Sequence, residues 1–341
     1  MSTRRHTARH VPCSHPQIRR AEESRPVTAT EVPVYDAGFL PEADGHAVWF
    51  EQSGRPDGVP VVYLHGGPGM GLESHVRSQF DPAFFRLMQF DQRGCGRSRP
   101  FGALQANTTW HLVDDIERLR RHLGIADWWV YGQSWGCALA LAYAQRHPAA
   151  VRGLLLQGVY LGTAAETAWI VDGWRQTYPE AWAVMAAALA LEEPARLHAR
   201  VAERLQHPDP AVQRAAVMAL TRFELTCCYL RPDPARVEAL LDYDFCRANT
   251  LINLHYHAAR FWLEPEQLLR DLPRITQLPL TVINGRHDVV TPMGVAWRLL
   301  QRWPGAELVV VDGAGHATDE PANVQAVTAT MDRLRDRLQG G

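Results

Sequence analysis

The sequence predicts a doubly wound α/β fold with a mostly parallel sheet and a helical insertion. Between several short apolar runs lie helix-like stretches such as 108–124, where Leu112, Ile116 and Leu119 follow one another at three- and four-residue spacing. The apolar runs are bounded by turn signals, as buried parallel strands are. They occupy residues 46–52, 60–66, 87–94, 127–133, 153–158, 278–285 and 307–313.

The alternation of strands and helices stops after about residue 158. From 160 to 270 the patterns are helical, rich in Ala, Leu, Arg and Trp, and interrupted by prolines; strand patterns then resume. We therefore predict a core at 33–159 and 271–341, with a helical cap at 160–270 inserted above the sheet.

Composition excludes several classes of function. The net charge is −2, which provides no basic surface for nucleic acid. No apolar run approaches the roughly 20 residues that span a bilayer. All 35 basic residues are arginine, which excludes Schiff-base chemistry and a P-loop lysine.

The N-terminal segment and the cysteines indicate a cytoplasmic protein. Residues 1–32 are rich in arginine and lack the apolar region of a signal peptide, so we expect a disordered tail. The six cysteines are widely spread and show no metal-ligand spacing, which favours reduced structural thiols. No metal or organic cofactor is implied.

The segment "GQSWGC" (132–137) is the strongest functional signal. A serine flanked by glycines two residues away, between a strand and a helix, is typical of a sharp turn that presents a nucleophile. Gly132 and Gly136 leave room for the chain to pass closely, and Ser134 lies at the positive end of the following helix. We predict that Ser134 is the nucleophile.

A serine nucleophile needs a base and an acceptor that orients the base. His316, in a loop after the last strand, is expected at the same sheet edge as Ser134, and Asp288 follows the preceding strand. Asp312 and Asp319 are alternative acids nearer to His316 in sequence. The order serine, acid, histidine is that of α/β-hydrolases.

Two glycine-containing segments follow strands. In "LHGGPGMG" (64–71), the N–H of Gly67 is expected to form an oxyanion hole with the N–H of Trp135. A phosphate cradle is the rival interpretation, but GxGxxG spacing and lysine are missing. In "DQRGCGRS" (91–98), Asp91, Arg93 and Gly94 are expected to fix a tight turn.

Five motifs together resemble the proline iminopeptidase family of α/β-hydrolases over about residues 35–335. They are "HGGPG", "DQRGCGRS", "GQSWG", "GRHDVVTP" and "GAGHATDEP". The resemblance implies that Ser134, Asp288 and His316 form a triad, with Gly67 and Trp135 as oxyanion donors. It implies an exopeptidase that releases an N-terminal proline through an acyl-enzyme.

The resemblance also implies that two cap glutamates bind the substrate's free amino group. Glu224 matches the first, with a surface residue paired to Arg222 or Arg231 as the alternative. Asn253 in "INLHYH" stands where the second carboxylate is expected. This substitution would weaken recognition of a free N-terminus by about 10- to 100-fold.

The remaining expected contacts are backbone and aromatic groups. Gly66 and Tyr256 are expected to bind substrate. An apolar pocket is expected from further aromatic residues, namely Trp169, Trp174, Trp182, Phe223 and Trp262.

Three functions are compatible with these features. The first is a serine aminopeptidase that takes N-terminal proline or a small apolar residue. The second is an esterase or amidase for a neutral substrate, and the third is a ligand-binding protein that keeps the hydrolase framework. The expected partner is a peptide, amide or ester; the oligomeric state is left open.

Overall fold

The core is a twisted sheet of nine strands in the computed structural model, which describes residues 16–21 and 32–340. The strand order is β1-β9-β8-β7-β6-β4-β5-β3-β2. β3 is antiparallel to both of its neighbours, β2 and β5, and the other pairs are parallel. The strands are β1 (Gln17–Arg20), β2 (Val34–Phe39), β3 (Trp49–Gly54), β4 (Val59–Leu64), β5 (Phe85–Phe90), β6 (Trp128–Gln133), β7 (Val151–Gln157), β8 (Leu280–Gly285) and β9 (Glu307–Val311).

Helices cover both faces of this sheet. Along β4, Val62 and Leu64 pack on one face, while Val61 and Tyr63 pack on the other, as the two-residue period of a strand requires. The first face is covered by α1 (Thr109–His122), α2 (Trp135–Arg146), α9 (Gln267–Arg270) and α10 (Met293–Leu300). The second face is covered by η1 (Ser74–Gln79) and α11 (Pro321–Gln339). These layers confirm the α/β-hydrolase architecture expected from the sequence.

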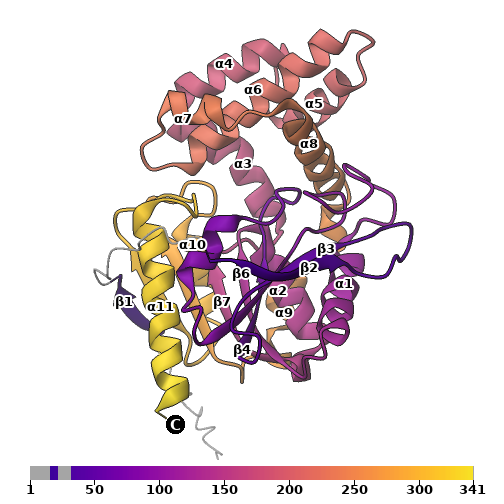
Figure 1. The fold of residues 1–341 in the computed structure, drawn as a ribbon. Coiled ribbons are helices and arrows are strands. Elements are labelled where there is room, and N and C mark those ends of the chain that lie inside the picture. The colour runs from indigo at the N-terminus through magenta and orange to yellow at the C-terminus, as the bar shows by residue number, and fades with distance from the viewer. Residues whose placement is uncertain (1–15, 22–31, 341) are drawn as a thin grey trace, which may run out of the picture.

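A cap of six α-helices stands above the sheet, joined to it along α3 and α8 (Figure 1). It has an apolar cluster of its own, centred on residues such as Met185, Val201 and Phe223. The helices are α3 (Ala164–Thr177), α4 (Pro179–Leu189), α5 (Leu197–Leu205), α6 (Pro210–Cys228), α7 (Pro234–Ala239) and α8 (Tyr243–Ala258). Short 3-10 turns complete the chain at η2 (Pro148–Ala150), η3 (Pro194–Arg196), η4 (Arg260–Trp262) and η5 (Leu272–Arg274).

The packing places the end of the cap earlier than the expected residue 270. Phe261, Leu263 and Leu268 belong to the apolar cluster of the sheet, and Gln145 of α2 donates a 2.7 Å hydrogen bond to the carbonyl of Leu268. Residues 261–270 therefore belong to the core, because their apolar side chains are buried against it.

Part of the expected disordered tail is instead a strand. β1 pairs in parallel with β9, with Ile18 opposite Leu308, and Arg19 forms an ion pair with Glu307 at 2.9 Å. The exposed edge of β9 provides the backbone partners for this otherwise polar segment. The rest of that expectation, residues 1–15 and 22–31, lies outside the described residues.

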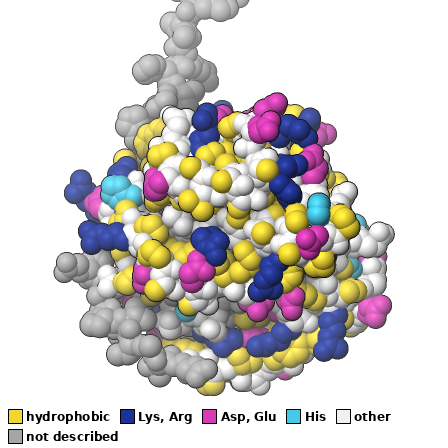
Figure 2. Space-filling view, turned by 90° about the horizontal axis from the view of Figure 1, so that it is seen from above, with side chains coloured by type: hydrophobic (Ala, Val, Ile, Leu, Met, Phe, Trp, Pro, Cys, Tyr) yellow, Lys and Arg dark blue, Asp and Glu magenta, His cyan; other side chains and the backbone are white. Residues whose placement is uncertain are grey.

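The cap surface carries mixed charge. Figure 2 shows basic and acidic side chains interspersed with hydrophobic ones on this face.

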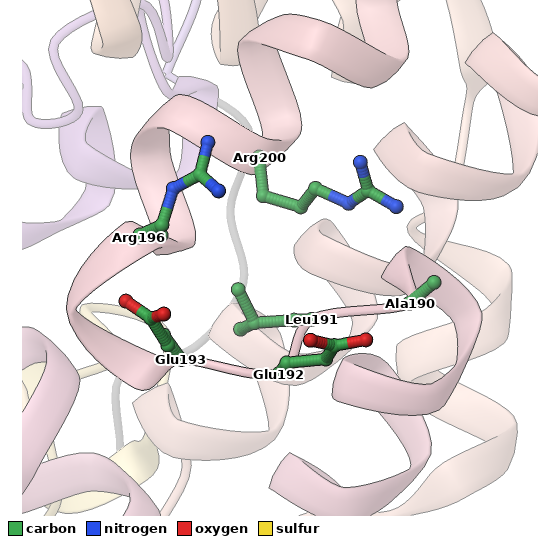
Figure 3. Close-up of a pocket in the computed structure, with 6 residues that line it drawn as sticks. All are labelled: Ala190, Leu191, Glu192, Glu193, Arg196 and Arg200. Carbon is green, nitrogen blue, oxygen red and sulfur yellow. The ribbon is translucent and has the colours of Figure 1, made fainter.

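One hollow in the cap is lined by Ala190, Leu191, Glu192, Glu193, Arg196 and Arg200 (Figure 3). Its arginines have partners, since Arg200 donates to the carbonyl of Leu189 and pairs with Glu203. We attribute this hollow to the end of α4, where Arg200 donates to the carbonyl of the last helical residue, Leu189.

None of the helices in the described ranges has the length and apolar character needed to span a membrane. The cysteines in these ranges (Cys95, Cys137, Cys227, Cys228 and Cys246) are free thiols. Cys13 lies outside the described residues.

Candidate active site

Ser134 lies at a sharp turn between β6 and α2. Its φ of 54° is in the left-handed region, which is strained for a residue with a side chain. Its N–H donates to the carbonyl of Gln157 at 2.9 Å, which fixes the turn to β7. A Cβ at Gly136 would lie 2.0 Å from the carbonyl oxygen of Leu64, so this position accepts only glycine. The close approach of α2 to β4 therefore depends on Gly136.

The three side chains expected to form a triad come together at the carboxyl edge of the sheet. His316 Nε2 lies 3.0 Å from Ser134 Oγ, and His316 Nδ1 lies 2.8 Å from Asp288 Oδ2. These residues follow β6, β8 and β9, parallel strands whose carboxyl ends face the same way. The imidazole is thus placed to take the serine proton while the carboxylate holds its other nitrogen.

Asp288 is held in turn by Thr291. The backbone N–H of Thr291 donates to Asp288 Oδ1 at 2.7 Å, and its hydroxyl donates to Oδ2 at 2.9 Å. The alternative acids have other partners: Asp319 accepts from Tyr229 and pairs with Arg236, and Asp312 pairs with arginines at the surface. Only Asp288 of these three contacts the imidazole.

The loop that carries His316 is fastened to the cap. The carbonyl of Cys228, at the end of α6, accepts from the N–H groups of His316 at 2.8 Å and Ala317 at 3.0 Å. Glu320 bridges the same two segments, because its carboxylate accepts from Leu230 N–H at 2.7 Å and Gly315 N–H at 2.6 Å. Movement of α6 would therefore move the loop that carries His316.

Two backbone N–H groups near Ser134 are free to bind an oxyanion. Within the described ranges, neither the N–H of Gly67 nor that of Trp135 makes a hydrogen bond. Trp135 begins α2, so its N–H lies at the positive end of the helix. Gly67 has a φ of 113°, a conformation that glycine adopts readily.

His65 secures the loop that carries Gly67. Its Nε2 accepts from Gln92 N–H at 3.1 Å, and its Nδ1 lies 2.9 Å from the carbonyl oxygen of Gly66 and 3.2 Å from the N–H nitrogen of Gly71. Burial lowers the pKa of His65 to about 4, which keeps the ring neutral near pH 7. The His65 imidazole therefore holds the loop that carries Gly67 in position.

The turn at 91–98 is structural, as expected, but its bonds differ from the expected ones. Asp91 accepts from the backbone N–H groups of Leu72 at 2.7 Å and Arg97 at 2.8 Å. Arg93 does not pair with Asp91; it forms a buried ion pair with Asp115 at 2.6 Å. Asp91 therefore fixes the position of the segment that follows the Gly67 loop.

A small cavity of about 70 Å³ opens between Ser134 and the cap. Glu224 of α6 and Asn253 of α8 line it, as their predicted roles require. Glu224 does not pair with Arg222, which binds Glu238 instead. The other lining residues are Gly67, Tyr160, Ile170, Trp174, His198, His257, Phe261, Val290 and Thr291.

Two residues expected to bind substrate are placed elsewhere. Tyr256 is fully buried, bonds to Asn107 Oδ1 at 2.9 Å and packs edge-on against Trp135, with ring centroids 5.1 Å apart. Gly66 packs behind the nucleophile, where a Cβ would lie 3.2 Å from Ser134 Cβ. Both expectations are corrected, since these residues support Ser134 and Trp135 from outside the cavity.

Of the aromatic residues expected in the pocket, Trp174 alone lines the cavity. Trp182 and Phe223 pack edge-on within the cap cluster, and the indole of Trp169 bonds to the carbonyl of Val289 at 2.7 Å. Trp262 packs against the core cluster. The sequence indicated these aromatic residues as pocket candidates, but it could not separate cavity wall from cap core or from surface, where Trp169 is 39% exposed.

The environment of Glu224 changes its acidity. Desolvation raises the pKa of this carboxyl from 4.5 to about 7. No hydrogen bond or ion pair from the described part of the chain reaches it. The Glu224 carboxylate is therefore available to bind a cation.

Four residues near the site were not identified from sequence as functional. Glu320 and Thr291 lie within motifs that the sequence displays, next to His316 and Asp288, and proximity to those residues is the signal that could have found them. His198 gave no signal, because it lies on a helix without a motif. His257 ends the segment "INLHYH", but its contact with His198 arises only through the tertiary fold.

Comparison with known proteins agrees with this geometry. An α/β-hydrolase fold family model matches residues 59–318. The proline iminopeptidase of Arabidopsis thaliana is 43% identical over 304 residues, covering 88% of this chain and 80% of that protein. That of Neisseria gonorrhoeae is 38% identical over 307 residues, covering 89% and 97% respectively.

A solved structure has the same fold. The proline iminopeptidase of Mycobacterium smegmatis superposes with a TM-score of 0.60 at 23% identity, covering 89% of this chain and 100% of that one. The identities with the curated relatives extend over both the sheet and the cap. On this evidence, the chain belongs to the proline iminopeptidase family of α/β-hydrolases.

Proposed function

We propose that this protein is a serine exopeptidase that releases an N-terminal proline, or another small apolar residue, from peptides. The observation that carries the proposal is Glu224, a carboxylate without a cation partner that lines a small cavity beside Ser134. The curated relatives named proline iminopeptidase support the same activity.

The proposed reaction begins when Ser134 Oγ attacks the carbonyl carbon of the first residue. Its proton passes to His316 Nε2, 3.0 Å away, and Asp288 stabilises the resulting imidazolium. The N–H groups of Gly67 and Trp135 donate hydrogen bonds to the developing oxyanion.

Collapse of the tetrahedral intermediate breaks the peptide bond. The proton on His316 Nε2 passes to the departing amine, which leaves as the shortened peptide, and the first residue remains as an ester on Ser134. His316 then takes a proton from water, whose oxygen attacks the ester carbonyl. Proton return to Ser134 Oγ releases the free amino acid.

The cap is proposed to select the substrate's free N-terminus. A positively charged amino group in this cavity loses hydration and needs an opposite charge, which Glu224 provides. The cavity that would hold this amino group has a volume of about 70 Å³. The free thiols within the described ranges support a reducing, cytoplasmic location.

The test compares a chromogenic prolyl amide with the same amide blocked by N-acetylation. We expect kcat/KM for the free amide to exceed that for the blocked amide by at least about 10-fold, the value of one charge-assisted bond. Preference for the blocked amide or for simple esters would instead favour an esterase or amidase that acts on neutral substrates.

A further inference from the structure

Two stacked histidines form part of the cavity wall that faces Ser134. His198 comes from α5 and His257 from α8, and both line the cavity that Glu224 lines. Their ring centroids are 4.5 Å apart with an interplanar angle of 21°, and His257 also packs edge-on against Phe261 at 4.9 Å. The ring of His257 is therefore fixed on two sides.

One ring nitrogen of His257 has no hydrogen-bond partner. Its Nδ1 is buried and has no hydrogen-bond partner. A buried polar atom without a partner costs free energy, so such atoms are uncommon unless a ligand supplies the missing bond. Desolvation, followed by repulsion from His198, lowers the pKa of His257 to about 3, so the ring stays neutral at working pH.

A neutral imidazole can accept a hydrogen bond from a cation without repelling it. The neutral ring carries one lone pair, and Nε2 is its solvent-accessible nitrogen because only Nδ1 is fully buried. Asn253 precedes His257 by one helical turn on α8, so both side chains lie on the same face of that helix and line the cavity. Glu224 reaches the same cavity from α6.

We propose that His257 is a substrate-binding residue: a nitrogen of its neutral ring accepts one N–H of the substrate's protonated N-terminus while the Glu224 carboxylate accepts another. His198 is a positioning residue that holds the ring of His257 by stacking. This inference rests on the proposed function, because it assigns an amine to the cavity. It gives the site one carboxylate and one neutral acceptor in place of two carboxylates.

The direct test is binding of L-prolinamide to the Ser134→Ala protein by calorimetry, so that turnover plays no part. Adding His257→Phe keeps an aromatic ring between His198 and Phe261 and removes the acceptor. We expect Kd for prolinamide to rise about 10- to 100-fold. His207→Phe, at the end of α5 and outside the cavity lining, is the matched control and should leave Kd unchanged.

Kinetics on proteins that retain Ser134 separate binding from folding. For His257→Phe, the fall in kcat/KM on a prolyl amide should exceed the fall on p-nitrophenyl acetate by about 10-fold, mainly through KM. Adding Asn253→Glu should recover part of the loss, because a carboxylate one turn away replaces the acceptor.

Three results would overturn the assignment: no change in prolinamide affinity, equal losses on amide and ester, or no detectable prolinamide binding to the Ser134→Ala protein. Failure of the proposed function is distinguishable from these results. In that case the wild-type protein would not cleave prolyl amides, while the effect of His257→Phe on prolinamide affinity would remain.

Discussion

Replacing Glu224 with glutamine should change stability and activity in opposite directions. The carboxyl lines the cavity beside Ser134, and desolvation raises its pKa from 4.5 to about 7. In the unfolded chain the same group ionises near 4.5. Between these two values the folded protein holds a proton that the unfolded chain releases, so stability falls as pH rises through this window and stays lower above it.

The size of the stability effect follows from the shift. A change from 4.5 to about 7 corresponds to roughly 3 kcal/mol for a fully desolvated group. Glu224 is only partly buried at the cavity wall, so solvent screening reduces this value and we expect roughly 1–3 kcal/mol. Glu224→Gln has no group to ionise, and its free energy of unfolding relative to wild type should increase by this amount between pH 4.5 and pH 8.

Denaturant unfolding of both proteins across this pH range measures the effect, because other titrating groups cancel in the difference. On a prolyl amide, the same variant should lose about 10- to 100-fold in kcat/KM, since one charge-assisted hydrogen bond is lost. The wild-type kcat/KM should also fall as pH drops below 7 and Glu224 becomes protonated. A pH-independent stability difference, or full activity of the variant, would refute this reasoning.

Further substitutions test other parts of the site. Ser134→Ala should lower kcat by about 10⁵–10⁶-fold and abolish labelling by a fluorophosphonate, and retained labelling would exclude Ser134 as nucleophile. Gly136→Ala places a Cβ 2.0 Å from the Leu64 carbonyl and should prevent soluble expression, whereas Gly294→Ala, with nothing within 4 Å, should not; equal Tm values for the two would contradict the close approach. Glu320→Gln turns an amide N–H toward one of the two backbone N–H groups that the carboxylate holds. Its kcat should fall about 5- to 50-fold with a smaller change in KM, while a change confined to KM would argue against positioning of the base.

Strands β3 to β9 and the meeting of Ser134, Asp288 and His316 at one sheet edge could be predicted because local sequence specifies them, whereas β2 was not predicted. Each apolar run that indicated a strand lies in β3 to β9, and the glycines around Ser134 indicated a turn that the φ of 54° confirms. The acid and the base could be placed because both follow buried strands of one parallel sheet. β1 could not be predicted, since its exposed polar segment gains order only from the edge of β9.

The residues of the cavity wall were harder to predict. Helical periodicity indicates which side chains are buried, but it does not indicate whether they are buried in an apolar core or line a cavity. Tyr256 and Trp174 are both buried aromatic residues of the cap region, yet only Trp174 reaches the cavity. The contact between His198 and His257 joins residues 59 positions apart, on helices whose relative placement is set by cap packing. Pairs of this kind can be identified only from a three-dimensional structure.

The central claim is that Ser134 carries the first residue of a peptide as an ester during turnover. Rapid acid quench of the protein during hydrolysis of a prolyl ester or amide, followed by digestion and mass spectrometry, tests this directly. The account predicts a prolyl adduct on the peptide that contains Ser134, formed in wild type and absent from Ser134→Ala. A prolyl adduct on another residue, or turnover by Ser134→Ala at the wild-type rate, would contradict it.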